Sequence, residues 1–315
     1  EALDAEALQE LNWQRRVKLV SHCYENSRFY RSKLEGVGFE PGDLKCDSDF
    51  QKLPILEKED LREHADRIAA SGVELKKLAV STTGGTTGVP LKTYQDPHIQ
   101  VSSMSWRMLN WWGVDPSDNS AYLYRTIPTG LKKIFYDLLL YPTKRSYLSA
   151  AEMTVKSMEQ FYRRLLRIKP KYLVGYVGSI DLFASFMDRK GYSLCGLEAI
   201  WTSAAPLPEV KRRYYERVFN CVVYTQYGSC ELYWISAECS GKNGLHIGTD
   251  IRHVDIVDGN SPVSTGEYGD IVVSDLTNYA FPLLRYRLGD RGRLLQQRCD
   301  CGLPYPMMDY VRGRV

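Results

Sequence analysis

Three short apolar segments in the middle of the chain constrain its fold more than any other feature. They are YLVGY at 172–176, AIWT at 199–202 and VVYT at 222–225, and each lies about one helix length from the next. This spacing is typical of strand-helix-strand units in a parallel sheet. An amphipathic segment at 151–168 precedes the first strand and stops before Pro170, as helices tend to do. The sequence therefore predicts an α/β fold.

The segments on either side extend this prediction. Apolar residues at helical spacing predict helices within 8–20, over 58–70 and over 98–112. From residue 245 onward the sequence changes to alternating strands with turn signals, as in HIGTDIRHVDIVDG and GEYGDIVVSDL. We therefore expect an α/β core over 1–244 and a smaller, mostly β region over 245–315.

Composition excludes several classes of function. The 315 residues are 44% hydrophobic and 25% charged with a formal net charge of +3, as in an average soluble protein. A charge so close to balance gives no indication of a nucleic-acid partner. No apolar run approaches the roughly 18 residues of a membrane-spanning helix. We therefore expect a cytoplasmic protein without a membrane or nucleic-acid partner. The sequence leaves open whether it is a monomer or a homodimer.

The segment STTGGTTGVP at 81–90 combines three glycines with five hydroxyl side chains. Glycines let backbone amides approach an anion, and hydroxyls add further donors. The segment lacks the lysine and spacing of a P-loop, and GxGxxG is also absent. Alone, it is equally compatible with a surface turn and with a phosphate-binding loop.

Further motifs follow this segment in a fixed order. They are SAAPLP at 203–208, YGSCE at 227–231, YRLGDRG at 286–292 and a closing GR at 313–314. YGSCE comes directly after a predicted strand, where open α/β sheets bind ligands. The ordered set resembles the adenylate-forming ligases, and KLPILEKEDL at 52–61, SHCYENSRFYR at 21–31 and CDCG at 299–302 resemble the phenylacetate-CoA ligase branch. The resemblance extends from about residue 20 to residue 314.

This resemblance implies a fold, a reaction and a set of site residues. The fold would be the large N-terminal domain of such an enzyme, with parallel-rich sheets flanked by helices and a smaller distorted β-barrel subdomain. A carboxylate would attack the α-phosphorus of ATP to give an acyl-adenylate, and coenzyme A would then displace AMP. Glu231 matches the magnesium-associated glutamate, a hard oxygen ligand, and Thr86 shares the catalytic role. The residues matched to ATP or AMP binding are Thr83, Gly85, Thr86, Thr87, Gly88, Ala204, Ala205, Pro206, Tyr227, Gly228, Ser229, Asp290 and Arg314.

Some positions depart from the family pattern. Gly84 replaces a common serine, and Cys230 replaces the hydroxyl residue before the glutamate. Members of the family continue past the GR into a small mobile domain that carries a catalytic lysine, and we expect that this domain is absent from this chain.

The last three cysteines suggest a metal site. Cys239 and His246 lie on one side of the β region, and Cys299 and Cys301 lie on the other. Three thiolates and one imidazole make a plausible tetrahedral zinc site, although the spacing is not that of a standard finger. Some relatives carry zinc at a matching arrangement, which implies a structural zinc ion here. His253 is the alternative histidine.

The acyl pocket is the part least determined by the sequence. The resemblance places Phe135, Tyr136, Tyr176, Ser179 and Tyr227 in the region that holds the substrate. We therefore expect activation of an aromatic or arylacetic acid with MgATP and transfer to coenzyme A. The alternatives are transfer to an amine, a hydroxyl or a carrier thiol, and a catalytically silent nucleotide-binding scaffold.

Overall fold

The computed structural model describes residues 3–82, 91–99 and 102–313, and these form two compact units. One unit comprises residues 1–101, 228–236 and 243–315, and the other comprises 102–227 and 237–242. The predicted boundary at residue 244 lies beside the division at 242, whereas the first hundred residues group with the β region. The assignment of 1–244 and 245–315 as separate parts remains a prediction.

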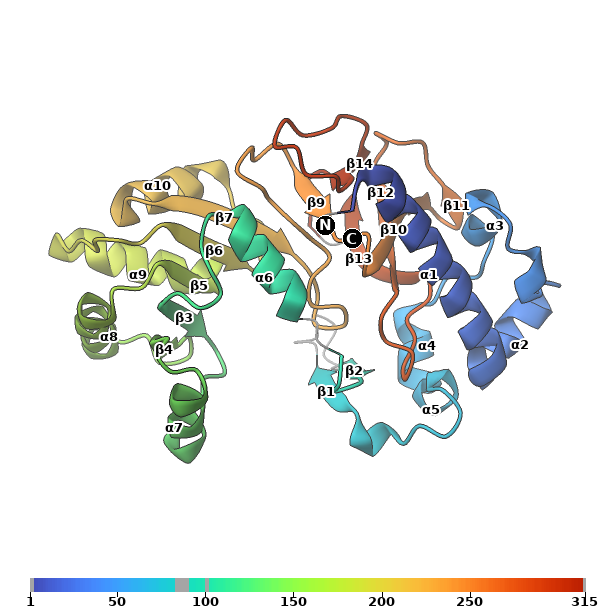
Figure 1. Cartoon of the computed structure of the whole chain (residues 1–315), viewed down its shortest axis with the longest axis horizontal. Helices are drawn as coiled ribbons and strands as arrows, with labels where there is room; N and C mark the ends of the chain where they lie inside the picture. Colours follow the sequence, from blue (N-terminus) through green and yellow to red (C-terminus); the bar gives the residue numbers. More distant parts are fainter. Residues whose placement is uncertain (1–2, 83–90, 100–101, 314–315) are drawn as a thin grey trace. The chain divides into compact units, whose positions relative to one another are not determined.

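The unit around residues 102–227 contains the predicted parallel sheet. Its strands are β3 (Ser120–Tyr124), β4 (Arg145–Ser149), β5 (Tyr172–Tyr176), β6 (Ala199–Ser203) and β7 (Val222–Tyr227), in the spatial order β4-β3-β5-β6-β7. The connecting helices are α7 (Gly130–Leu139), α8 (Val155–Ile168), α9 (Val177–Lys190) and α10 (Glu209–Phe219), and α6 (Ser102–Trp111) precedes β3 (Figure 1). The predicted α/β class is therefore confirmed.

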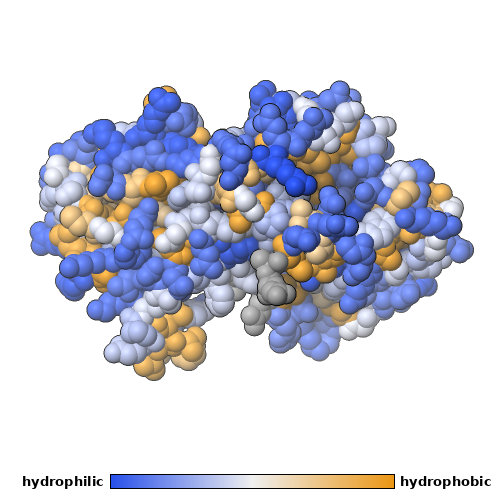
Figure 2. Space-filling model, turned by 45° about the horizontal axis from the view of Figure 1, so that its top comes forward, coloured by the Kyte–Doolittle hydropathy of each residue, from blue (hydrophilic) through white to orange (hydrophobic). Residues whose placement is uncertain are grey.

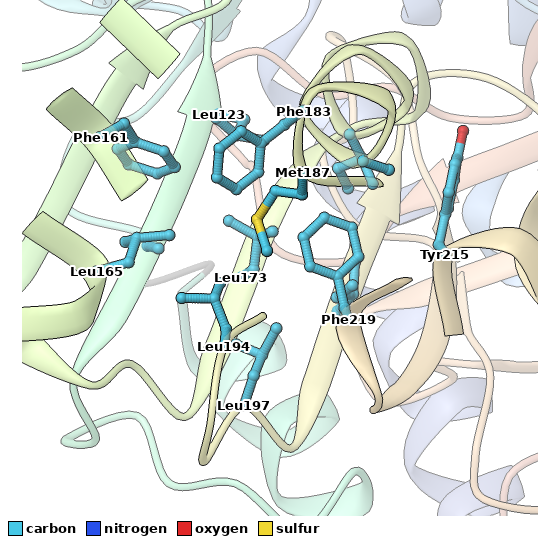
Figure 3. Close-up of a cluster of buried hydrophobic side chains, with 14 of the residues drawn as sticks. Leu123, Phe161, Leu165, Leu173, Phe183, Met187, Leu194, Leu197, Tyr215 and Phe219 are labelled. Atoms are coloured by element: carbon cyan, nitrogen blue, oxygen red, sulfur yellow. The ribbon is translucent and has the colours of Figure 1, made fainter. Parts of the chain in front are cut away.

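A hydrophobic core holds these helices against the sheet. Phe161 and Leu165 of α8, Phe183 of α9 and Phe219 of α10 are almost completely buried and pack with strand residues such as Leu173 (Figure 3). Burial of each large apolar side chain stabilises the fold by about 1.5–3 kcal/mol. This core fixes the strand ends, from which the loops of the candidate site extend.

The other unit combines N-terminal helices with antiparallel strands. Its helices are α1 (Ala5–Asn26), α2 (Arg28–Gly36), α3 (Asp47–Gln51), α4 (Lys58–Glu63) and α5 (Ala65–Ile68), with short 3-10 turns η1 (Pro41–Asp43) and η2 (Leu75–Lys77). A hairpin joins β1 (Ala79–Thr82) to β2 (Lys92–Gln95), and the four-stranded sheet has the order β11 (Ser261–Pro262), β10 (Arg252–Asp258), β12 (Gly269–Asp275), β13 (Tyr286–Gly292). Strands β9 (Leu245–Ile247), β14 (Leu294–Leu295) and β15 (Met307–Met308) pair antiparallel, and β8 is Ser236–Ala237.

Several element boundaries differ from the sequence predictions. The predicted helix over 58–70 is two helices, because His64 leaves the helical conformation at φ −126° and ψ 20°. The helix predicted from residue 98 begins at Ser102. The helix predicted from residue 151 begins at Val155, because the Thr154 hydroxyl caps it by accepting a hydrogen bond from Ser157 N at 3.1 Å.

Candidate functional site

The carboxyl ends of the parallel strands carry one part of the candidate site. Tyr124 ends β3 and Tyr176 ends β5, and their ring centroids are 5.1 Å apart. Burial, together with the nearby Tyr122 and Tyr176 phenols, raises the pKa of Tyr124, so this phenol stays neutral and can donate a hydrogen bond. Tyr227 ends β7 at the same edge. This edge is where open α/β sheets bind ligands.

The segment after β6 has an unusual backbone. Ala204 adopts φ +71°, a left-handed conformation that residues with a Cβ rarely take. Backbone of this kind costs about 1–3 kcal/mol and gathers at functional sites. Ala204, Ala205 and Pro206 are all exposed, so their backbone groups remain accessible to a ligand. The predicted nucleotide-contacting segment is thus an exposed turn at the carboxyl edge of the sheet.

Glu231 is a buried carboxylate of the other unit. It is only 6% exposed, and the Tyr286 hydroxyl donates a hydrogen bond to its Oε1 at 3.1 Å. Burial and the charge of Glu231 raise the pKa of Tyr286, which keeps its proton in place for this bond. The side chain of Gln95 donates to the Glu231 carbonyl oxygen at 3.0 Å. Two motifs that are 55 residues apart in sequence, YGSCE and YRLGDRG, therefore meet at one buried carboxylate.

A tight turn orients this glutamate. The Ser229 hydroxyl accepts a hydrogen bond from Leu232 N at 3.2 Å, and the Ser229 carbonyl accepts one from Tyr233 N at 2.7 Å. The buried Arg252 donates to the Leu232 carbonyl oxygen at 2.7 Å and pairs with Asp275 at 2.6 Å. Because Arg252 is completely buried, this ion pair fixes the backbone beside Glu231.

A second buried charge cluster lies in the same unit. Arg285 donates to the carbonyl oxygens of Gln51 and Leu53, and its Nε lies 3.6 Å from Asp255 Oδ2. His253 contacts the same carboxylate at 3.2 Å. Burial opposes ionisation of Asp255, but the neighbouring positive charges outweigh it and lower the pKa of Asp255. This cluster joins the segment before α4 to the four-stranded sheet.

The GDRG segment is a strand and not the hairpin corner that such a sequence usually forms. Leu56 N donates a hydrogen bond to the Arg285 carbonyl oxygen, and the Leu56 carbonyl oxygen accepts one from Arg287 N, each at 3.0 Å. These bonds align KLPILEKEDL with β13. Gly289 adopts φ +80°, and a Cβ there would lie 2.7 Å from Lys58 Nζ. The positive φ favours glycine at this position, and the flexible end of Lys58 would have to move to accept a Cβ. Asp290, partly exposed, is the next residue.

Sequence reasoning missed several of these site residues. Gln95 and Tyr286 bond to Glu231 itself, and Arg252 bonds to the carbonyl oxygen of the next residue, Leu232. Lys58 lies against Gly289. A partial signal existed for Tyr286, because it begins the YRLGDRG motif and a buried carboxylate requires a donor.

The structure describes only some of the predicted nucleotide-binding residues. Thr83, Gly85, Thr86, Thr87, Gly88 and Arg314 lie outside the described residues, as does Gly84. Thr82 and Lys92 are paired in the antiparallel hairpin on either side of the glycine-rich segment. Gly228 and Ser229 follow directly after β7 and are partly exposed.

The predicted acyl-pocket residues have different environments. Ser179 is 6% exposed and lies in the first turn of α9, close after Tyr176. Phe135 and Tyr136 lie on α7 and are 62% and 38% exposed. Neither ring of α7 is enclosed to the degree expected of an apolar slot, so their assignment to the pocket remains a prediction.

The four predicted zinc ligands come together. One ligand atom from each of Cys239, His246, Cys299 and Cys301 lies within 4.8 Å of the other three. His246 Nδ1 is 3.0 Å from the Tyr305 carbonyl oxygen, which can only accept, so Nδ1 carries the proton and Nε2 offers its lone pair to a metal. Burial lowers the pKa of His246, which also favours the neutral ring. His253, the alternative ligand, instead contacts Asp255.

Backbone amides support two of the sulfur atoms. Gly241 N donates to Cys239 Sγ at 3.3 Å, and Leu303 N donates to Cys301 Sγ at 3.5 Å. His246 Nε2 lies 3.3 Å from Cys301 Sγ. Bonds of this kind stabilise thiolates and orient metal ligands. The donor set and its geometry therefore fit zinc.

Comparison with known proteins gives relatives along the whole chain. No protein-family model matches. The phenylacetate-coenzyme A ligases of Escherichia coli and Thermus thermophilus are each 27% identical, and each alignment covers all of this chain and 72% of the relative. A solved open conformation of 2-hydroxyisobutyryl-CoA ligase, in complex with 2-HIB-AMP and CoA, shares the fold with a TM-score of 0.84 at 20% identity, over all of this chain and 71% of that one.

Among the described residues, no helix is both long and apolar enough to cross a membrane.

The relatives, the shared fold and the ordered motifs identify the chain as a relative of the phenylacetate-CoA ligase-like branch of the adenylate-forming superfamily, an enzyme of the adenylate-forming acid-thiol ligase class.

Proposed function

We propose that the protein activates an aromatic or arylacetic carboxylate with ATP and transfers the resulting acyl group to coenzyme A. The observation that carries this proposal is the hydrogen bond from Tyr286 to Glu231, which unites YRLGDRG and YGSCE at a buried carboxylate. Phenylacetate-coenzyme A ligases are among the curated relatives, which supports both the reaction and the arylacetic class of substrate.

The reaction proceeds in two balanced steps. A carboxylate oxygen of the substrate attacks the α-phosphorus of ATP, the bond between this phosphorus and the β-phosphate oxygen breaks, and pyrophosphate leaves. The thiolate of coenzyme A then attacks the acyl carbon, and AMP leaves with the electron pair of the broken C–O bond. Because negative charge accumulates on the leaving group in each step, the protein must supply aligned donors and cations.

Glu231 suits the role of a magnesium ligand. Its Oε1 accepts the Tyr286 hydrogen bond, and a carboxylate has further lone pairs with which to bind a hard cation. Mg²⁺ bound there would neutralise charge on the phosphate oxygens. Tyr286, Gln95 and Arg252 would position the carboxylate through the contacts described above.

The remaining nucleotide roles follow the sequence motifs. The proposal assigns the pyrophosphate to the amides and hydroxyls of 83–88 and the ribose hydroxyls to Asp290, an acceptor-only group. Ala204, Ala205 and Pro206 would lie against the adenine, with Arg314 on the ribose or phosphate. The accessible backbone after β6 supports the adenine assignment.

The acyl group would occupy the carboxyl edge of the parallel sheet. Tyr176, Ser179 and Tyr227 lie at or shortly after the ends of β5 and β7. The neighbouring Tyr124 ring adds a further apolar surface with a neutral hydroxyl. An aromatic acid suits such a surface, because rings stack at offset or tilted angles.

A structural zinc ion is part of the proposal. Cys239, His246, Cys299 and Cys301 would hold it as a closed four-ligand site. Bound there, it would stabilise the fold and take no part in acyl transfer.

Product analysis tests the reaction directly. The full protein is incubated with ATP, Mg²⁺, coenzyme A and a panel of aryl, arylacetic and aliphatic acids, and AMP and acyl-CoA are measured by mass spectrometry. We expect equal amounts of both products with an aromatic or arylacetic acid. AMP formation with acyl-hydroxamate in the presence of hydroxylamine, but no acyl-CoA, would instead favour an amine, hydroxyl or carrier-thiol acceptor.

Replacement of Tyr286 by phenylalanine tests the contact on which the proposal rests. The change removes only the hydroxyl, and a hydrogen bond to a charged group contributes about 1.5–3 kcal/mol. If Tyr286 positions Glu231, kcat for adenylation should fall about ten-fold or more, while nucleotide affinity, assigned to Asp290, should change little. Asp290→Ala should show the opposite pattern. Equal, negligible effects of both changes would contradict the site assignment.

A further inference from the structure

A basic cavity lies at the amino ends of strands in the parallel sheet, whereas Tyr124 and Tyr176 of the candidate active site lie at the carboxyl ends. It has a volume of about 320 Å³, and its charged lining residues are Lys133, Lys144, Arg145, Arg164, Arg167 and a single acid, Asp137. Arg145 begins β4, and Arg164 and Arg167 lie in the last turns of α8. Strands β3 and β4 run parallel in register, so the cavity is at their amino ends. Tyr124 and Tyr176 are four residues further along their strands, which is about 13 Å at about 3.3 Å per residue.

The cavity has an excess of positive charge. Asp137 pairs with Lys133, one turn away on α7. For the other four cations the structure records no ion pair within the described part of the chain. Burial and the charge of Arg167 lower the pKa of Arg164, because these two cations repel each other at close range. Such an arrangement is unfavourable unless an anion compensates it.

Two of the arginines that line this cavity are held by contacts with neighbouring residues. Arg164 is held in place by bonds to the Ser146 hydroxyl at 3.2 Å and to the Tyr147 carbonyl oxygen at 3.1 Å. Arg145 is held by a side-chain hydrogen bond with Tyr147 and lies over the Tyr122 ring, 5.8 Å from its centroid. A guanidinium held in this way is suited to bind phosphate oxygens, because it loses less conformational freedom when it does so.

We propose that this cavity binds a phosphomonoester or a comparable small dianion. The volume is at the lower end of the range of small-molecule sites, about 300–1,000 Å³, which suits a phosphate head on a short organic group. The site is distinct from the nucleotide-binding edge, because it is formed at the opposite ends of the strands.

The surface beside the cavity suggests a second source of the same chemistry. Helix α7 exposes an apolar face, with Leu131, Ile134 and Leu138 exposed by 85%, 63% and 76%. Figure 2 shows apolar surface on the projecting segment where Figure 1 labels α7. An apolar helix face beside cations is also typical of contact with anionic lipid. The phosphomonoester is therefore either free in solution or the head group of a lipid, and the experiment separates the two.

Hydrogen exchange with two probes tests the proposal. Glycerol 3-phosphate is added to the full protein, and amide protection is compared in segments 133–146 and 160–168 with that elsewhere. Vesicles of phosphatidylcholine with and without phosphatidic acid carry the same phosphomonoester in lipid form. We expect protection of both segments by the free probe, the lipid probe or both, which identifies the source. Protection by neither probe would overturn the proposal.

Matched variants assign the effect to the cavity. Arg167 and Lys144 are exposed, so Arg167→Gln and Lys144→Gln should not disturb folding. Each should weaken binding of the protective probe about ten-fold, the scale of one charged hydrogen bond. Lys156→Gln removes an exposed positive charge from the same helix outside the cavity and should change binding by less than about two-fold. Equal effects of Arg167→Gln and Lys156→Gln would show nonspecific charge attraction and overturn the proposal.

Discussion

Replacement of Glu238 by glutamine should strongly destabilise the unit that contains the parallel sheet. Glu238 is completely buried, and its Oε1 accepts from Arg212 at 2.7 Å. Its Oε2 accepts from Arg212 at 3.1 Å and from Thr225 N at 2.7 Å. In either orientation, the glutamine amide would place an NH₂ group against at least one of these donors. The change also leaves the nearly buried Arg212 without its buried counter-charge.

The expected cost follows from these contacts. Breaking a buried ion pair by removing one partner costs about 3–5 kcal/mol, compared with a total stability of about 5–15 kcal/mol. At about 2–4 °C per kcal/mol, the melting temperature should fall by roughly 6–20 °C. Hydrogen exchange should accelerate in β7, because Thr225 lies in that strand and Arg212 also donates to the Val223 carbonyl oxygen.

The assay is thermal unfolding at neutral pH combined with hydrogen exchange. Glu159→Gln is the matched control, because Glu159 pairs with Arg163 on the surface of α8, where such pairs contribute less than about 1 kcal/mol. A double-mutant cycle with Arg212→Met should give a coupling energy of about 1–3 kcal/mol. If the Glu238→Gln protein melted at the same temperature as the Glu159→Gln protein, the large cost expected for breaking this buried pair would be wrong.

Three further changes test other parts of the structure. The pKa of Asp255 is lowered on folding. Its stabilising contribution is therefore present above the unfolded pKa of about 3.9 and is lost as pH falls through the folded pKa. The difference in melting temperature between wild type and Asp255→Asn should shrink from pH 7 to pH 3, and a constant difference would contradict this. Gly289→Ala should cost about 1–3 kcal/mol in unfolding free energy, because a residue with a Cβ is strained at φ +80°. An unchanged unfolding free energy in chemical denaturation would contradict this strain. Cys299→Ser should lower zinc content and melting temperature together, whereas the exposed Cys195→Ser should change neither; metal-free wild-type protein with an unaltered melting temperature would remove the zinc site.

The periodic parts of the fold were predictable from the sequence. Strand β5 has the predicted bounds, and the strands predicted at 199–202 and 222–225 extend by one and two residues. A short apolar run between helical segments predicts a strand, because a strand that is buried on both faces is rich in β-branched and aromatic residues. The break at His64 was not predictable, because the periodicity of apolar residues does not register a change in one backbone angle.

The candidate site was predictable only in its motif residues. Glu231 was predicted from the family resemblance, and its role stays a prediction. The four cysteine and histidine ligands were predicted from residue type and from the resemblance, and the structure brings these four together. The groups that position Glu231 could not be identified in this way, because Gln95 and Arg252 are ordinary polar residues whose partners are distant in sequence. Buried polar contacts of this kind depend on the complete fold.

Exchange of radioactive pyrophosphate into ATP tests the proposed adenylation reaction. The exchange requires reversible formation of an acyl-adenylate and does not depend on the identity of the acyl acceptor. We predict exchange by the full protein with Mg²⁺ only when a cognate aromatic or arylacetic acid is present, and a loss of most of the rate in Glu231→Gln. Binding of ATP without exchange for any acid in the panel would contradict the proposed adenylation and favour a catalytically silent nucleotide-binding scaffold.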